Sequence, residues 1–278
     1  MTRIMWNSKD VYYVSDSTAI LAEDMGRALL CQFHEIGFNE EKIPFVRTPA
    51  DARKALQHIL EQSGGRSPLV FCTIMDRECR QILNSAEVEF YDIFGIFLDR
   101  LEKSLETEPL REPGFSRHSD DIDIVERVEA IHYSIRHDDG TKTSEYGEAE
   151  IILVGVSRSG KTPVSVYLAT HMGLKSANFP LTSDHLERYE LPRDIVRNRK
   201  KVVGLTCSPQ HLHKIREKRY AGSRYASLST CTRELQQAQE LFMRHNIKVL
   251  RTEGRSIEEL AVQTTQLLGI SKKRRRKR

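Results

Sequence analysis

The sequence predicts an α/β protein in which an N-terminal parallel-sheet α/β domain precedes a P-loop kinase-like α/β domain. Short apolar runs alternate with stretches of helical spacing along most of the 278 residues. That alternation is typical of a parallel sheet covered by helices on both faces. In addition, Gly155-x-x-x-x-Gly160-Lys161-Thr162 lies between an apolar run and a helical stretch, which is the setting that the Walker A pattern requires. A chain of this length has room for two such domains.

The N-terminal domain is expected to hold four strand and helix pairs. We expect strands at 11–15, 43–46, 68–74 and 88–91, and helices at 19–33, 49–62, 76–84 and 93–105. The turn after the first strand is Asp16-Ser17-Thr18, where Ser17 or Thr18 is a natural helix N-cap. A second interpretation remains open, because hydroxyl-rich turns at the carboxyl ends of strands are where open α/β sheets bind ligands.

A change of composition follows this domain. Residues 102–123 contain prolines and a mixed run of charges, which indicates a surface connection. A helix over 124–135 then ends at His137-Asp138-Asp139-Gly140. Gly140 alone would explain the helix end by adopting the left-handed conformation. However, an imidazole and two carboxylates just before the P-loop strand are also the groups that phosphoryl transfer uses to hold Mg²⁺ and to orient a hydroxyl nucleophile.

The P-loop itself is expected to bind the phosphates of a nucleotide. It follows a buried strand at 151–154, and Pro163 suits the first turn of the next helix. Loop N–H groups and the positive end of that helix then point at one spot. Lys161 would neutralise the terminal phosphates and Thr162 would hold Mg²⁺. An ordinary glycine-rich turn is the alternative to nucleotide contacts at Gly155, Val156, Ser157, Arg158, Ser159, Gly160, Lys161 and Thr162.

The remaining C-terminal elements match a small P-loop kinase domain with one part missing. Strands are expected at 175–179, 201–206 and 247–250, and helices at 209–218, 232–245 and 256–268. The strand at 201–206 does not end in the aspartate of a Walker B motif. Other carboxylates must therefore hold a metal ion, and the candidates are Asp138, Asp139 and Asp184. We expect an N-terminal α/β domain at 1–105, a connecting segment with the helix that ends in His137-Asp-Asp-Gly140 at 106–145, and a P-loop kinase-like domain at 146–270. A basic disordered tail is expected at 271–278.

A basic cluster between Lys214 and Arg224 has two interpretations. It is either a solvated helix face or a mobile lid that hinges at Gly222 and brings Arg219 and Arg224 onto phosphates. The overall formal charge of +4 is misleading, because seven of the 43 basic residues form the tail and 36 remain against 39 acidic ones. A strongly basic body, which would have pointed to nucleic acid, is therefore missing.

Hydropathy and cysteine usage indicate a cytoplasmic protein. The chain has no apolar run of the roughly 20 residues needed to span a bilayer and no apolar signal sequence at its start. Its five cysteines are widely spaced and include no C-x-x-C pair, which favours reduced thiols over zinc or disulfides.

Five motifs together resemble the bacterial phosphoenolpyruvate synthase regulatory proteins, a family that includes the pyruvate, phosphate dikinase regulatory proteins. The resemblance covers residues 11–270 and leaves out only the tail. The motifs are Val11-Tyr-Tyr-Val-Ser-Asp-Ser-Thr-Ala19, His137-Asp-Asp-Gly140, Gly155-Val-Ser-Arg-Ser-Gly-Lys-Thr-Pro163, Ala177-Asn-Phe-Pro180 and Ser223-Arg-Tyr-Ala-Ser227.

This resemblance implies a bifunctional enzyme that acts on phosphoenolpyruvate synthase. Members of the family phosphorylate a threonine beside the catalytic histidine of their target with ADP as donor, and so inactivate it. They also remove that phosphate with inorganic phosphate and release pyrophosphate. For this chain we expect Lys161 as electrostatic stabiliser, with Asp138, Asp139 and His137 in the catalytic set and Mg²⁺ as cofactor.

Several alternatives remain open at this point. The same paired reactions could act on pyruvate, phosphate dikinase, although Ser223-Arg-Tyr-Ala-Ser227 with Cys231 resembles the synthase branch more closely. The C-terminal domain alone would also suit a small-molecule P-loop kinase. From another class, a nucleotide-gated protein could use the tail on nucleic acid with strong salt dependence. The sequence leaves the oligomeric state open, including a homodimer.

Overall fold

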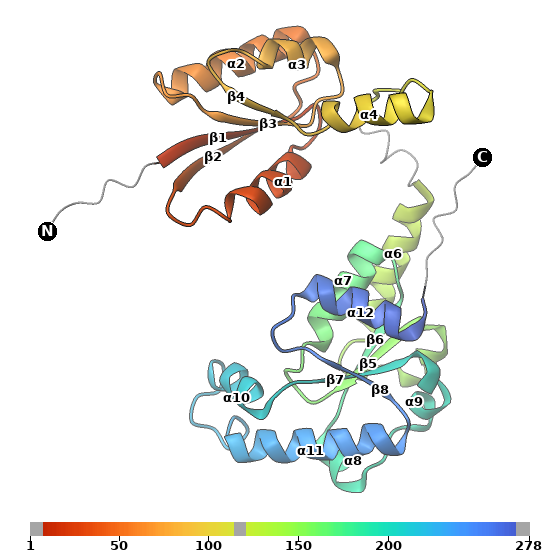
Figure 1. Cartoon of the computed structure of the whole chain (residues 1–278). Helices are drawn as coiled ribbons and strands as arrows, with labels where there is room; N and C mark the ends of the chain where they lie inside the picture. Colours follow the sequence, from red (N-terminus) through yellow and green to blue (C-terminus); the bar gives the residue numbers. More distant parts are fainter. Residues whose placement is uncertain (1–7, 114–120, 271–278) are drawn as a thin grey trace, which may run out of the picture. The chain divides into compact units, whose positions relative to one another are not determined.

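The computed structural model describes residues 8–113 and 121–270, and its contacts divide the chain into two compact units, Met1–Ser119 and Asp120–Arg278. Each unit contains one four-stranded sheet, and every strand pair in both sheets is parallel. Helices lie against the sheets in Figure 1. The predicted class, two consecutive α/β parts with parallel sheets, is therefore confirmed.

The first sheet has the strand order β2-β1-β3-β4. Val11 and Tyr13 of the central strand face α1, whereas Tyr12 and Val14 face α2 and α3, so alternate residues of one strand enter two separate cores. The elements are β1 (Ser8–Val14), α1 (Ile20–Leu30), β2 (Gly37–Ile43), α2 (Pro49–Ser63), β3 (Leu69–Cys72), α3 (Arg77–Leu83), β4 (Glu89–Asp92) and α4 (Gly95–Leu105).

Two local predictions in this unit are wrong. The strand expected at 43–46 is β2, Gly37–Ile43, which is mostly polar and exposed. An edge strand has one sheet neighbour and needs few apolar residues, so its pattern does not show the strand. The N-cap of α1 is Ala19 with φ 60°, without a side-chain cap, instead of Ser17 or Thr18.

The second sheet has the equivalent order, β6-β5-β7-β8. Figure 1 shows α7 and α12 on one side of this sheet and α11 on the other. The elements are α6 (Asp121–Arg136), a 3₁₀ helix η1 (Thr143–Glu148), β5 (Ile151–Gly155), α7 (Lys161–Met172), β6 (Ser176–Pro180), α8 (Ser183–Arg188), α9 (Arg193–Arg197), a 3₁₀ helix η2 (Arg199–Lys201), β7 (Val202–Thr206), α10 (Pro209–Glu217), α11 (Leu228–Arg244), β8 (Lys248–Arg251) and α12 (Ile257–Leu268).

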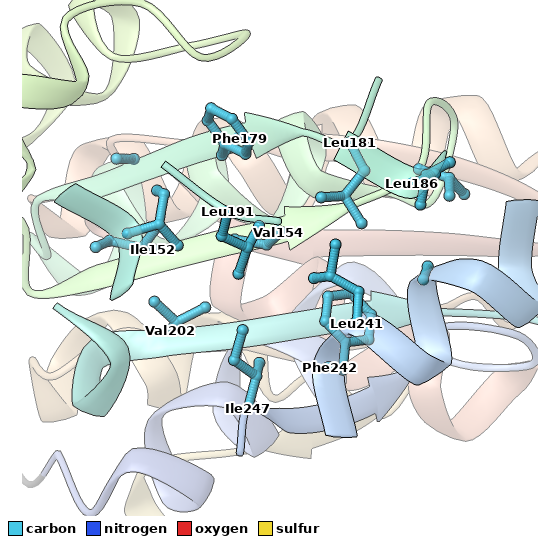
Figure 2. Packing of buried hydrophobic residues seen from close by; sticks show 14 of the residues in the cluster. Ile152, Val154, Phe179, Leu181, Leu186, Leu191, Val202, Leu241, Phe242 and Ile247 are labelled. Atoms are coloured by element: carbon cyan, nitrogen blue, oxygen red, sulfur yellow. The ribbon is translucent and has the colours of Figure 1, made fainter. Parts of the chain in front are cut away.

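The central strand β5 is buried along its whole length. Helices cover both of its faces, so side chains on both faces are apolar and the strand sequence is a continuous apolar run. On the side shown in Figure 2, Leu241 and Phe242 of α11 belong to the same core as Ile152 and Val154 of β5. A Cβ on Gly204 of β7 would lie 2.8 Å from the Phe242 ring, so glycine permits this close approach.

Helix α6 packs against α7 and β6. It therefore lies within the second unit. The segment predicted at 106–145, a connection and the helix that ends in His137-Asp-Asp-Gly140, is divided between the two units. The packing carries the turn after α6 to the carboxyl end of β6, next to the P-loop. The predicted basic tail at 271–278 lies outside the described residues. Among the described helices, none combines the length and apolar character that crossing a membrane requires.

Candidate active site

The P-loop connects the carboxyl end of β5 to the start of α7. A Cβ on Gly155 would lie 2.6 Å from Ser159 Oγ and 2.7 Å from the Leu205 carbonyl oxygen, so this position has no room for a side chain. Gly160 has φ 92° and Arg158 has φ 73°, which place both in the left-handed region. The loop conformation therefore depends on both glycines of the motif.

The loop is open to an anion. Among the described residues, the backbone N–H groups of Ser157, Arg158 and Gly160 donate to no protein acceptor, whereas Ser159 N donates to Val156 O at 3.3 Å. Free N–H groups at a helix start are the donors that bind phosphate oxygens. Beside the loop lies a pocket of about 360 Å³, lined by Ser157, Arg158, Tyr220, Ser223 and Tyr225.

Lys161 is buried at the first position of α7, with 5% of its surface exposed. Its Nζ donates to the Val156 carbonyl oxygen at 3.0 Å, across the loop. Burial lowers the pKa of the Lys161 amine to about 8, and the carboxylates of Asp139 and Asp138 oppose that shift. A diphosphate bound in the loop would place negative charge beside this amine and so favour its charged form.

Asp138, Thr162 and Asn178 form a polar cluster at the start of α7. Thr162 Oγ1 donates to Asp138 Oδ1 at 3.2 Å, and Asn178 Nδ2 lies 2.9 Å from Thr162 Oγ1 and also donates to Asp138 Oδ1. The backbone fixes this arrangement, because Gly140 N donates to Asn178 O at 2.9 Å and Asn178 N donates to His137 O at 3.0 Å. The structure thus brings the turn at 137–140 to the P-loop helix.

His137 is fully buried behind this turn. Its Nδ1 lies 2.7 Å from the Tyr133 carbonyl oxygen and its Nε2 lies 2.9 Å from Glu145 Oε2. The ring also stacks on Tyr133 at a centroid distance of 3.8 Å. Both ring nitrogens are therefore engaged within the protein, and the ring fixes the end of α6 to η1.

The other carboxylate candidates occupy different surroundings. Asp139 is exposed, has φ 52°, and lies near enough to Lys161 to oppose the lowering of its pKa. Asp184 is on α8, with 63% of its side chain exposed, and pairs with Arg188 at 3.0 Å. The structure therefore brings Asp138 and Asp139 to the P-loop, whereas Asp184 forms a surface ion pair.

The basic cluster at 214–224, which begins on α10, contains one buried arginine and several exposed ones. Arg216 is fully buried, and its Nη2 donates to the Ser157 carbonyl oxygen at 3.0 Å and to Glu234 Oε2 at 2.7 Å. Its guanidinium carbon lies 4.1 Å from the centroid of the Tyr225 ring. Arg216 thus connects α10, α11 and the P-loop, whereas the lid candidates Arg219 and Arg224 are both exposed.

Sequence reasoning did not assign a function to Asn178, Glu145 or Arg216. Asn178 was visible only as part of the motif Ala177-Asn-Phe-Pro180, and Arg216 was one of several basic residues in a row. The sequence contains one signal for Arg216, which lies one helical turn after the apolar Leu212. The structure buries both residues. No comparable pattern marks Glu145, whose partner depends on the fold of η1.

Comparisons with known proteins match this chain over almost its whole length. A protein from Desulfotalea psychrophila, named "Putative phosphoenolpyruvate synthase regulatory protein", is 48% identical over 264 residues, which cover 95% of this chain and 97% of that protein. Proteins with the same name from Laribacter hongkongensis and Neisseria meningitidis serogroup C are 42% and 39% identical, and each match covers 97% of this chain and 100% of the relative. The model of the kinase/pyrophosphorylase family matches residues 11–264, and the chain belongs to that family.

Proposed function

We propose that this protein regulates phosphoenolpyruvate synthase by two opposed reactions at one site. In the first, a threonine of the synthase takes the β-phosphoryl group of ADP and AMP leaves. In the second, inorganic phosphate takes that phosphoryl group from the threonine and leaves as pyrophosphate. The observation that carries the proposal is the polar cluster of Asp138, Thr162 and Asn178 beside an open P-loop that ends at Lys161. The family description, kinase/pyrophosphorylase, supports a pair of reactions of this type, and the names of the relatives support the synthase as the target.

The P-loop supplies the electrostatic part of the mechanism. The free N–H groups of Ser157, Arg158 and Gly160 would bind phosphate oxygens, and Lys161 would move from the Val156 carbonyl oxygen to the transferring group. Phosphoryl transfer is catalysed mainly by positioning and by stabilising charge on the equatorial oxygens. The buried amine is effective here because little water competes for it.

The cluster at the start of α7 fits a magnesium ion. Thr162 Oγ1 and Asp138 Oδ1 are hard oxygen ligands that lie 3.2 Å apart. Asn178 Oδ1 is buried without a hydrogen-bond partner among the described residues. Mg²⁺ prefers such oxygens together with phosphate oxygens and water. When bound, the ion would neutralise charge on the phosphates. In our proposal Thr162 and Asp138 hold it.

The second carboxylate is then free for the acceptor hydroxyl. Asp139 is exposed beside Lys161 and would accept the threonine proton as the phosphoryl group transfers. His137 would act as a positioning residue, because both of its ring nitrogens are engaged and its burial keeps it from the acceptor. Exposed Arg219 and Arg224 remain candidates for closing over the phosphates.

The direct test mixes the purified protein and purified phosphoenolpyruvate synthase with ADP in one sample and ATP in another. Mass spectrometry of the synthase should show one phosphorylated threonine beside its catalytic histidine, with ADP only. Phosphorylation of pyruvate, phosphate dikinase instead would move the target to the sister enzyme. Turnover of ATP with a metabolite and no protein acceptor would indicate a small-molecule kinase.

A competition experiment tests whether the two reactions share the P-loop. Since both need a phosphate at the loop, saturating ADP should inhibit the phosphate-dependent release of pyrophosphate from phosphorylated synthase. If ADP leaves that rate unchanged, inorganic phosphate binds at a separate site.

A further inference from the structure

A tyrosine from the segment at 218–227, which connects α10 to α11 in Figure 1, is hydrogen-bonded to the P-loop. Tyr225 Oη donates to Ser157 Oγ at 2.8 Å, although the two residues are 68 positions apart. Ser157 lies in the first half of the loop, and within the described part of the chain its own N–H has no acceptor. Tyr225 therefore contacts the part of the loop that is open to phosphate.

Arg216 fixes Tyr225 in place. Arg216 Nη1 donates to the Tyr225 carbonyl oxygen at 3.1 Å, and the guanidinium carbon lies 4.1 Å from the centroid of the Tyr225 ring. A cation over an aromatic ring is attracted more strongly when it is buried, and Arg216 is fully buried and paired with Glu234 at 2.7 Å. The neighbouring Ala226 is buried as well, and its carbonyl oxygen lies 2.6 Å from His213 Nδ1. Both the backbone and the ring of Tyr225 are thus held.

The same arginine orients one peptide group of the P-loop. Arg216 Nη2 donates to the Ser157 carbonyl oxygen at 3.0 Å. In a trans peptide, the carbonyl group of one residue and the N–H group of the next point in opposite directions. The N–H group of Arg158 therefore points away from Arg216. Arg158 has φ 73°, which is uncommon for a residue with a side chain, so its surroundings must maintain this conformation.

The hydroxyl of Ser157 retains a hydrogen that it can donate. A serine hydroxyl has one hydrogen to donate and two lone pairs that accept. Because Tyr225 Oη is the donor between the two residues, only a lone pair of Ser157 Oγ is used. Accepting this bond polarises the hydroxyl and strengthens the bond that it donates. Ser157 is exposed, so a phosphate oxygen can reach that hydrogen.

We propose that Tyr225 is a positioning residue of the phosphate site. Together with Arg216 it holds Ser157 so that the Ser157 hydroxyl and the Arg158 N–H both bind phosphate oxygens. This role rests on the phosphoryl transfer proposed above, and it applies to every ligand that brings a phosphate to the loop. It differs from a contact with the nucleoside, which the pocket lined by Tyr225 also allows and which would affect ADP alone.

The test is calorimetric titration of the full chain with ADP and with pyrophosphate, each in the presence of Mg²⁺. Tyr225→Phe keeps the ring over Arg216 and removes only the hydroxyl. It should weaken the binding of both ligands by the same factor, about threefold to tenfold, which corresponds to the loss of one hydrogen bond. The denaturant midpoint of the free chain should stay unchanged, because the lost bond is exposed to solvent.

Ser157→Ala removes the oxygen atom that Tyr225 contacts. It should weaken both ligands more than Tyr225→Phe does, because the serine hydroxyl itself binds phosphate. Adding Tyr225→Phe to Ser157→Ala should cause no further loss, since Tyr225 acts through Ser157. Tyr189→Phe is the matched control and should bind both ligands as the wild-type chain does. The ring of Tyr189 lies 4.2 Å from the guanidinium carbon of Arg244, and its hydroxyl has no partner in the described ranges.

The pyrophosphate titration decides between the two roles of Tyr225. Unchanged pyrophosphate affinity in Tyr225→Phe would overturn the positioning role, even with weaker ADP binding, because Tyr225 would then contact the nucleoside. A further loss in the double variant would also overturn it, as would a wild-type chain that binds ADP and not pyrophosphate. A wild-type chain that binds neither ligand would overturn the proposed function together with this role.

Discussion

Thr162 Oγ1 donates a hydrogen bond to Asp138 Oδ1 at 3.2 Å, although the two residues are 24 positions apart. The contact exists because α6 packs on α7 and because the turn at 137–140 is hydrogen-bonded to β6. It places a carboxylate beside the P-loop threonine, whereas β7 ends without the aspartate of a Walker B motif. In the proposed mechanism, the segment before the P-loop is therefore as important as the P-loop itself.

Lys161→Met should remove activity and preserve the fold. Methionine is similar in length and apolar, so it suits a position that is 5% exposed. Loss of the Lys161 amine should reduce both reactions on the order of 100- to 1,000-fold, which is typical for removing a transition-state donor. Phosphorylation and pyrophosphate release should be measured beside circular dichroism. A folded variant with the normal rate would show that the amine does not act on phosphate.

Exchange of the two carboxylates for amides should separate their roles. Asp138→Asn should raise the Mg²⁺ concentration needed for half-maximal phosphorylation, because Asp138 contacts Thr162. Asp139→Asn should lower the maximal rate and leave the Mg²⁺ dependence unchanged, because in the proposed mechanism Asp139 accepts the threonine proton. The measurement is a magnesium titration of threonine phosphorylation for each variant. Full activity of Asp139→Asn in both directions would remove that residue from the mechanism.

ADP binding should take up a proton in alkaline solution. Burial lowers the pKa of the free Lys161 amine to about 8 from an ordinary value of 10.5, so above about pH 8 the empty site holds a neutral amine. A diphosphate favours the charged form and raises that pKa again. Affinity for ADP should therefore fall as pH rises above about 8. Calorimetry in buffers of different ionisation enthalpy measures the proton uptake, which Lys161→Met should abolish.

Gly155→Ala should distort the P-loop, because the added Cβ would lie 2.6 Å from Ser159 Oγ and 2.7 Å from the Leu205 carbonyl oxygen. We expect loss of ADP binding and a lower melting temperature. Gly147→Ala is the matched control, since a Cβ at Gly147 would meet no atom within 4 Å. Equal ADP affinity in the two variants would mean that the close packing of the loop is unimportant.

Arg216→Met should destabilise the second unit. The substitution leaves Glu234 and the Ser157 carbonyl oxygen without their buried cation, and breaking such a pair costs on the order of 3 kcal/mol. The free energy of unfolding should be measured with denaturant, with Arg219→Met as the exposed control. Adding Glu234→Gln to Arg216→Met should restore part of the loss. A stability equal to that of the control would contradict the connecting role of Arg216.

The sequence predicts the parts of this fold that local patterns determine. Strand β5 is buried on both faces, so its apolar run is unmistakable, and α2 begins at the expected Pro49. Strand β2 was misplaced because an exposed edge strand has no apolar pattern, and α9 was not predicted because it has only five residues. Patterns of this kind carry little information about short or exposed elements.

The candidate site was predictable in its components and not in their arrangement. The P-loop motif and the turn at 137–140 stand out in the sequence. In contrast, the burial of His137 between Tyr133 and Glu145 depends on how α6 meets η1. The same holds for Arg216, which the sequence presents as one of several surface charges and the fold places beneath the P-loop. Long-range packing decides such roles, and spacing along the chain does not reveal it.

The most direct test of the central claim follows one phosphorus atom through both reactions. ADP labelled in its β-phosphate is incubated with phosphoenolpyruvate synthase and this protein, and inorganic phosphate is then added. The label should first appear on a threonine of the synthase and then in pyrophosphate, and Lys161→Met should prevent both transfers. Label that never reaches the threonine, or reaches it equally with Lys161→Met, would contradict a shared phosphoryl site at the P-loop.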